Sequence, residues 1–447
     1  MATAANPLPS SKDKMFLSVA TIAVALICVS ALFVTGEAGK GSGAEMSTIA
    51  EHLVSGRGFA SPYLPPEQAT PTTVSPPLYV WLMAVTYELF GIKSFTSRLL
   101  LQLLNIAFHC GTLIVLFHFC QRTLSALAAR TFAVLYSLHP HLIYLPSNIW
   151  ETSLTTLLLS LILYIATFHL AQCKAWGLTL FGVLLGITSL SNPAWTTSYP
   201  FMCLLPFLLQ GNRPRVAPLL KALPLITIVF TLVVSPWVYR NYLVTGEFIF
   251  VRGMTGPEWF KGNNELSGGG HGDGFVRYYL LANVAEDERQ KLATLGEQGY
   301  NDHTMQAALD FIREHPQDFA LLTAKRILMW WTGDLDATRW YYEQRNSSFL
   351  TGSGSSHYFL LGLLLTLSGT VTSLFAFAGL YHIQRPRRRL WALYVYLILL
   401  PLPFYLIVAG FRYQSALMPF LLIPASHAVA LLLARIQSRN TVTWAAP

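Results

Sequence analysis

The sequence predicts an all-α integral membrane protein, a polytopic bundle of about ten spanning helices if each crossing takes roughly 20 apolar residues. Two observations support this fold class. Of the 447 residues, 53% are hydrophobic and only 12% are charged, whereas a typical soluble domain carries about 25% charged residues. The Lys and Arg residues lie in short gaps between long apolar runs, as the topology signals of membrane proteins do.

The first predicted helix follows Lys12 and Lys14 and covers the apolar run from Met15 to Val34. A cleaved signal peptide is the alternative, but its apolar core is shorter and is followed by a small-residue cleavage site, so we expect a retained helix. The predicted spans cover residues 15–35, 98–120, 126–145, 152–171, 175–192, 195–210, 217–238, 358–383, 389–409 and 413–435.

The charges between the spans predict which side each gap faces. Basic residues mark the gaps that contain Arg122, Lys174, Arg213 and the run QRPRRR, which therefore face the cytoplasm with both termini. Every Asp and Glu except Asp13 then lies on the outer side or at its edge. The predicted parts are a cytoplasmic N-terminus 1–14, a transmembrane module 15–239 with a first outer loop 36–97, an outer segment 240–356, C-terminal spans 357–436 and a cytoplasmic tail 437–447.

The outer regions are predicted to contain surface helices. The run from Pro77 to Gly91 is too short for a full crossing and is expected to lie at the outer surface. The stretch from Ala44 to Ser55 has an apolar face at helical spacing and is expected to lie on the membrane. In the second outer segment, helices are expected at 301–315 and 318–331, separated by Pro316.

Composition also argues against several classes of protein. The net charge of +8 is spread over the gaps, whereas a nucleic-acid binder concentrates basic residues on a soluble face. The five cysteines show no CxxC spacing and are read as small buried hydrophobic residues. The His139-Pro140-His141 pair has no third ligand close in sequence, so no metal site is predicted.

An ordered set of motifs resembles a known family. In order, they read AEMSTIAEHLVSGRGF, PTTVSPPLYVWLMAVTYELFG, SRLLLQLLN, LHPHLIYLPSNIWETSL, SPWVYRNYLVTGEFIFVRG with GNN, and GFRYQSALMPFLL. This order, from about Phe16 to Ile436, resembles the membrane glycosyltransferases of the GT-C fold, in the protein-mannosyltransferase-like and aminoarabinose-transferase-like branch (family 39 type).

The resemblance implies an enzyme of the bacterial inner (plasma) membrane with a periplasmic active site. It implies a polyprenyl-phosphate-linked sugar as donor, a hydroxyl of a lipid, glycan or protein as acceptor, and inversion at the anomeric carbon. It also implies a carboxylate base in the first outer loop. Where many members have Asp or Asp-Glu, this chain has Gly43-Ala44-Glu45-Met46, so Glu45 is the candidate base. The alternative is a capping box with Ser42. No motif is taken as support for a divalent metal, and no cofactor is assigned.

The leaving phosphate requires positive charge, and the candidates are Arg98, Arg240 and Arg412 at the outer ends of three spans. Guanidinium groups bind phosphate well, although snorkelling at the interface explains each arginine singly.

The candidate substrate-binding residues are Glu151, Asn263, Asn264 and Tyr413. Glu151 contacts the acceptor or an arginine in this interpretation; the alternative is a favourable charge at a helix N-terminus. Asn263 and Asn264 match the outer-loop GNN motif, for which a plain loop is the alternative. Tyr413 follows Arg412 in the last motif.

Two other functions are kept open. A transporter or flippase for a lipid-linked sugar predicts ionisable groups within the spans and related halves, and neither is evident in the sequence. A membrane protein that binds a lipid-linked sugar without turnover is the second alternative, since the family's usual Asp is replaced by Glu45.

Overall fold

The computed structural model describes residues 10–41, 43–209, 216–270, 286–333, 355–383 and 390–443, and within them the regular secondary structure is helical apart from one isolated bridge between Ala60 and Pro71. Five helices are long and apolar enough to cross a membrane: Ser11–Val34, Phe95–Thr123, Val216–Thr245, Gly362–His382 and Arg412–Ser438. The chain is therefore a multi-pass membrane protein.

Helices occupy each of the apolar runs that the sequence singled out. The N-terminal ones are α1 (Ser11–Val34), α4 (Phe95–Thr123), α5 (Ala126–Leu138) followed by α6 (Pro140–Tyr144), α7 (Thr152–Phe168), α8 (Ala175–Ser191), α9 (Tyr199–Leu209) and α10 (Val216–Thr245). The C-terminal ones are α16 (Ser355–His382), α17 (Trp391–Leu399), α18 (Leu402–Leu406) and α19 (Phe411–Thr443). Several of these are shorter than a full crossing, so the helix positions are confirmed while the number of crossings stays a prediction.

The main core is built around α19. The apolar, potentially membrane-spanning stretch of α19 is 72% buried, in contrast to 17% for that of α10. Helix α19 packs on α16, α5 and α7, and α10 packs mainly on α8. A close approach makes the α16–α19 contact possible, since a Cβ at Gly379 would collide with the backbone of Pro424. Small residues allow helices to approach in this way inside a membrane.

A second core joins the two outer regions. It contains Tyr79 and Met83 of α3 (Pro77–Phe90), Ile49 of α2 (Ala44–Val54), Trp237 of α10 and Tyr300 of α13 (Glu286–Glu314). The apolar face of α2 is thus covered by α3, and the expectation that this face rests on lipid is wrong. Packing against protein removes from water the same apolar side chains that the pattern assigns to the membrane.

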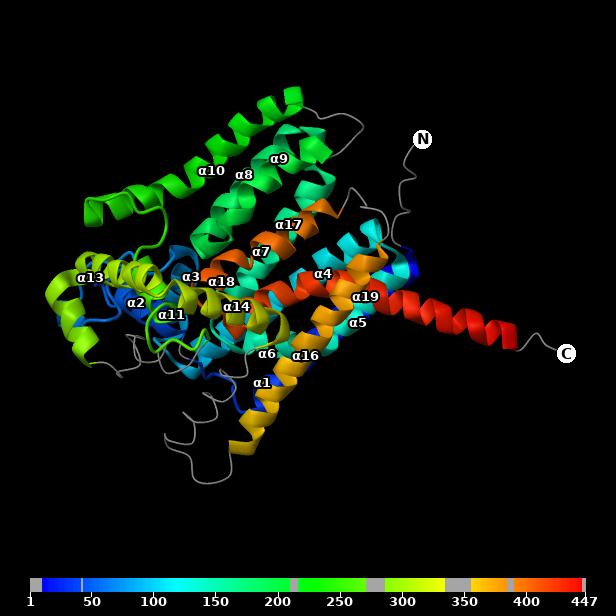
Figure 1. Ribbon diagram of the computed structural model, residues 1–447, viewed down its shortest axis with the longest axis horizontal. Coiled ribbons are helices and arrows are strands. Elements are labelled where there is room, and N and C mark those ends of the chain that lie inside the picture. The colour runs from blue at the N-terminus through cyan, green and yellow to red at the C-terminus, as the bar shows by residue number, and fades with distance from the viewer. Residues whose placement is uncertain are drawn as a thin grey trace.

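The outer helices gather at one end of the molecule, where Figure 1 shows α2, α11 (Thr255–Gly262), α13 and α14 (Pro316–Thr332) together. Helix α13 is longer than the helix predicted at 301–315, and it is kinked at Gly296. The predicted break at Pro316 is confirmed, because Pro316 opens α14, where a missing N–H costs nothing.

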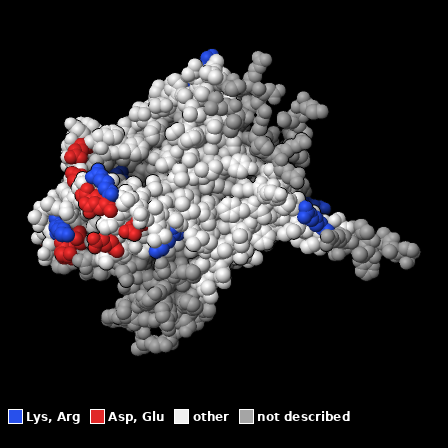
Figure 2. Space-filling view, viewed as in Figure 1, with Lys and Arg blue, Asp and Glu red and all other residues white. Residues whose placement is uncertain are grey.

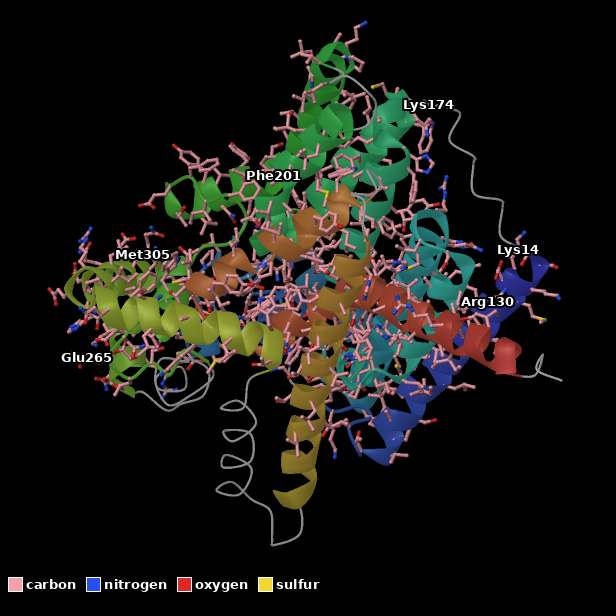
Figure 3. The ribbon with its side chains drawn as sticks, turned by 45° about the vertical axis from the view of Figure 1, so that its right-hand side comes forward. Lys14, Arg130, Lys174, Phe201, Glu265 and Met305 are labelled. Atoms are coloured by element: carbon pink, nitrogen blue, oxygen red, sulfur yellow. The ribbon has the colours of Figure 1, made fainter. Side chains whose placement is uncertain are left out.

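Acidic and basic residues are segregated along the molecule. In the view of Figure 2, all visible Asp and Glu gather at the end that holds the outer helices, and only Lys and Arg are visible at the opposite end. Figure 3 places Glu265 and Met305 at the first end and Lys14, Arg130 and Lys174 toward the other. At that basic end Asp13 is the buried exception to the charge pattern, and it pairs with Arg130 at 2.7 Å.

Candidate functional site

Glu45 lies in the first turn of α2, and the position of this turn is set by Gly43. Gly43 is the N-cap and has a left-handed backbone with φ 61°, a conformation that suits glycine. A Cβ there would also come within 2.7 Å of the Met83 side chain. Because Gly43 is the N-cap, Glu45 is the second residue of the helix. A capping box with Ser42 requires Glu45 to be the third residue. Ser42 itself lies outside the described residues.

The half-buried Glu45 carboxylate accepts a hydrogen bond from the Tyr63 hydroxyl at 3.2 Å. Tyr63 belongs to the Pro-rich part of the first outer loop, so this bond ties the loop to the start of α2. Burial, and next the charge of Glu45, raise the pKa of the Tyr63 phenol well above its usual value. Tyr63 therefore stays protonated and remains a donor to the carboxylate.

Two arginines lie within electrostatic reach of Glu45, and they come from distant parts of the chain. Arg252 precedes α11 and interacts with both Glu258 and Glu45. Arg412, at the start of α19, interacts with Glu151 and also with Glu45. Two charged segments from distant parts of the chain therefore lie within electrostatic reach of this carboxylate.

Arg252 is held by the first outer loop and by α11. Its Nε donates to the Val74 carbonyl at 2.8 Å, and its Nη2 contacts Glu258 Oε1 at 2.9 Å. The same Oε1 accepts from Lys261 Nζ at 3.0 Å. Burial raises the pKa of the Glu258 carboxyl group, but Lys261 and Arg252 outweigh burial and bring this pKa to about 2. Glu258 is therefore ionised at every physiological pH.

Arg412 and Glu151 form a second charged pair, which links the beginnings of α19 and α7. The Arg412 guanidinium bonds to Glu151 Oε2 and lies 5.0 Å from the Trp150 ring centroid. Glu151 is only 4% exposed and accepts a further bond from Asn192 at 3.0 Å. Tyr413 lies between the two pairs, within electrostatic reach of Arg412, Glu258 and Arg252, and its ring stacks on Phe404 at 4.3 Å.

The structure places the two other predicted phosphate-binding arginines away from this group. Arg240 donates to the carbonyls of Thr72 (2.5 Å) and Phe59 (3.1 Å), and so holds the first outer loop against α10. Arg98 lies within electrostatic reach of the Tyr87 hydroxyl on α3. Among the described residues Arg240 interacts electrostatically with Glu297 and Arg98 with Tyr87, whereas Arg252 and Arg412 interact with Glu45.

Asn263 and Asn264 are buried and bonded to backbone. Asn263 donates to the carbonyls of Trp259 (3.0 Å) and Leu406 (3.1 Å) and accepts from buried Arg326 at 3.1 Å. Asn264 closes the end of α11 through the Phe260 carbonyl at 2.7 Å. The GNN motif thus joins α11 to α14 and α18, and it stabilises the helix that carries Glu258 and Lys261.

His139 and His141 likewise form hydrogen bonds with other protein groups. His139 contacts Thr372 at 3.0 Å, and His141 contacts Ser415 at 3.0 Å and the Leu365 carbonyl at 2.9 Å. These bonds connect α6 with α16 and α19. Among the described residues there is no group of three His, Cys, Asp or Glu side chains that could hold a metal ion, and all five cysteines are free.

The structure thus brings together four predicted residues, Glu45, Glu151, Arg412 and Tyr413. It adds four residues that the sequence reasoning did not single out: Tyr63, Arg252, Glu258 and Lys261. Arg252 had one sequence signal, since it is a lone charge at the end of the apolar run FIFV within a quoted motif. The other three had none, because their role depends on contacts across the fold.

Comparison with solved structures identifies the fold. The oligosaccharyltransferase of Archaeoglobus fulgidus in its apo form matches with TM-score 0.55 at 14% identity, over 97% of this chain and 52% of that one. The archaeal oligosaccharyltransferase AglB of the same organism, in complex with an inhibitory peptide and a dolichol-phosphate, matches with TM-score 0.53 at 14% identity, over 98% and 52%. The chain therefore spans about half the length of these enzymes.

A weaker match is ArnT from Cupriavidus metallidurans bound to undecaprenyl phosphate, with TM-score 0.41 and 12% identity over 93% of this chain and 77% of that one. No family profile matches the sequence. No curated protein matches it at the level of sequence.

Proposed function

We propose that this chain, which has the GT-C fold of membrane glycosyltransferases, is an inverting glycosyltransferase. It moves a sugar from a polyprenyl-phosphate donor to a hydroxyl acceptor on the outer face of the membrane. One observation carries the proposal: Glu45, at the junction of the two outer regions, lies within reach of Arg252 and Arg412. A base beside fixed cations is the pair of groups that this transfer requires.

In the proposed reaction Glu45 takes the proton of the acceptor hydroxyl. The acceptor oxygen attacks the anomeric carbon from the face opposite the phosphate, and the bond between that carbon and the phosphate oxygen breaks. The polyprenyl phosphate leaves with the electron pair, next to Arg412 and Arg252. A single displacement of this kind inverts the anomeric centre. Glu45 is left protonated and returns its proton to solvent on the outer side.

The segregation of charge supports the proposed orientation. The acidic end holds α2, α11 and α13, and the opposite end is basic (Figure 2). Basic residues favour the cytoplasmic side, so the site would face the periplasm, with both termini in the cytoplasm. The proposed parts stay as the sequence indicated, with residues 36–97 and 240–356 outside.

A lipid-phosphate donor agrees with the matched structure of AglB, which is in complex with a dolichol-phosphate. For this chain the donor class is part of the proposal. Among the predicted substrate-binding residues we retain Glu151 and Tyr413 as residues beside the reacting groups. We assign Asn263 and Asn264 a structural role at the end of α11.

The test is sugar transfer in membranes that contain the full chain, with polyprenyl-phosphate sugars carrying a radiolabel. Glu45→Gln is expected to lower transfer by about 100-fold or more, because a positioned general base contributes roughly 10²–10⁴-fold. Glu88→Gln is the matched control, since Glu88 is exposed on α3. Full transfer by a folded Glu45→Gln variant would remove Glu45 from the mechanism. Donor binding without transfer by the wild type would favour the non-catalytic alternative.

A further inference from the structure

The triad of Arg252, Glu258 and Lys261 combines two cations with one carboxylate. Both cations bond to the same atom, Glu258 Oε1, at 2.9 and 3.0 Å. Lys261 is 6% exposed, and the Glu258 carboxylate compensates the charge of its ammonium group in this buried position. The triad has a net charge of +1, and the Arg412–Glu151 pair beside it has none.

The position of the triad connects it with the proposed reaction. Arg252 is anchored to the first outer loop through the Val74 carbonyl at 2.8 Å, and the next residue of the chain bonds to that loop again, from the Gly253 N–H to the Thr73 carbonyl at 2.8 Å. Glu45 and Tyr63 both lie within electrostatic reach of Arg252. An anion held by Arg252 would therefore lie next to the proposed base.

The Glu258 carboxylate has the features of an internal substitute for a phosphate. It is an oxyanion, it offers one oxygen to two cationic donors, and its side chain is more exposed than that of Lys261, at 23% against 7%. Lys261 lies deeper, and the Arg252 side chain, although 28% exposed, is bonded to the Val74 carbonyl, so Glu258 is the member of the triad that would turn away when a phosphate binds.

We propose that Arg252 and Lys261 form a subsite for the phosphate of a lipid-phosphate ligand, and that Glu258 occupies this subsite and competes with the phosphate. The ligand class rests on the proposed function. When the donor binds, its phosphate replaces Glu258 between the two cations. After transfer, the return of Glu258 displaces the lipid phosphate and promotes product release. The strongly depressed pKa of Glu258 agrees with a carboxylate that is ionised and able to compete throughout.

The experiment measures binding of farnesyl phosphate to the full chain in detergent, for wild type, Glu258→Gln and Glu265→Gln. Removing a charge close to the ligand anion is expected to lower the Kd by about tenfold or more, in line with couplings measured for close charge pairs. Glu265→Gln removes the same charge from an exposed position in the following loop and should leave the Kd unchanged. Lys261→Met should weaken binding.

Two further binding measurements test the proposal, one with a second variant and one with a second ligand. Glu258→Asp keeps the charge on a shorter arm and should give an intermediate Kd; it replaces Glu258→Gln if that variant fails to fold. Inorganic phosphate should bind much more weakly than farnesyl phosphate, and equal binding would indicate a site for the free anion and overturn the proposal. An unchanged or higher Kd in folded Glu258→Gln and Glu258→Asp would also overturn it, as expected of a triad with a purely structural role.

The outcome is separable from that of the proposed function. Tighter binding in Glu258→Gln without sugar transfer by the wild type would support the phosphate subsite and remove the enzyme assignment. Transfer by the wild type, with the same Kd in all carboxylate variants, would keep the enzyme and remove the competition by Glu258.

Discussion

At the scale of single residues, the side chains around Glu45 act mainly by fixing its position. The Tyr63 hydroxyl donates to one carboxylate oxygen, and Gly43 sets where the helix carrying Glu45 begins. A base works only when it lies within hydrogen-bond reach of the proton it removes. We therefore regard Tyr63 as a positioning residue for the proposed reaction.

Tyr63→Phe removes the hydrogen bond while the ring remains. In sugar-transfer assays, kcat is expected to fall by about tenfold, since a hydrogen bond to a charged group is worth roughly 1.5–3 kcal/mol. KM for the donor should stay the same, because the lost contact is with the base and not with the donor. Tyr239→Phe, at an exposed tyrosine of α10, is the control. A rise in KM with unchanged kcat would contradict the positioning role.

At the scale of elements, Glu297 connects the outer helix α13 with the first outer loop. Its carboxylate oxygens accept from the Thr72 hydroxyl at 2.6 and 2.8 Å. Arg240 also bonds to this loop, at the carbonyls of Thr72 itself and of Phe59. Because the same loop carries Tyr63, this contact supports the site from outside.

The Glu297 contact is expected to depend on pH. Burial raises the pKa of its carboxyl group above the model-compound value of 4.5, although hydrogen bonds from Ser61 and Thr72 oppose the rise. A group with a raised folded-state pKa stabilises fully below the unfolded-state value and loses this contribution as pH rises through the folded-state value. Protection of residues 59–73 from amide exchange should therefore fall as pH rises above about 4.5, by this linkage.

Glu297→Gln is neutral at every pH and keeps an oxygen that can accept from Thr72. It should flatten this part of the pH dependence of amide exchange. Asp310→Asn is the control, since it removes a carboxylate from an exposed position of the same helix. The same pH dependence in wild type and Glu297→Gln would show that another group is responsible.

At the scale of the whole molecule, the charge segregation predicts the orientation in the membrane. Glu265 lies at the acidic end and Lys174 toward the basic end (Figure 3). A single cysteine introduced at position 265, in a chain whose five native cysteines are replaced, should react with a membrane-impermeant maleimide in cells with a permeable outer envelope. A cysteine at position 174 should react only after the inner membrane is opened. Labelling of both from the same side would contradict the proposed topology.

Much of the fold was determined by the sequence itself. A backbone within lipid must satisfy its hydrogen bonds internally, so each apolar run, such as 98–120, had to form a helix, and α4 does. Pro316 cannot continue the helix before it, and the break lies there. The separation of Asp and Glu from the basic gaps was also visible in the sequence, because charge is excluded from the spans.

Only the tertiary structure decided which charged residues meet. Arg98, Arg240 and Arg412 looked alike in sequence, yet Arg412 lies near Glu45 while Arg240 bonds to backbone carbonyls. Arg252 and Lys261 reach the site because the segment before α11 is bonded to the first outer loop, far away in the chain. The period of the apolar residues specifies a helix and its buried face, whereas the partner of a side chain depends on how distant helices pack.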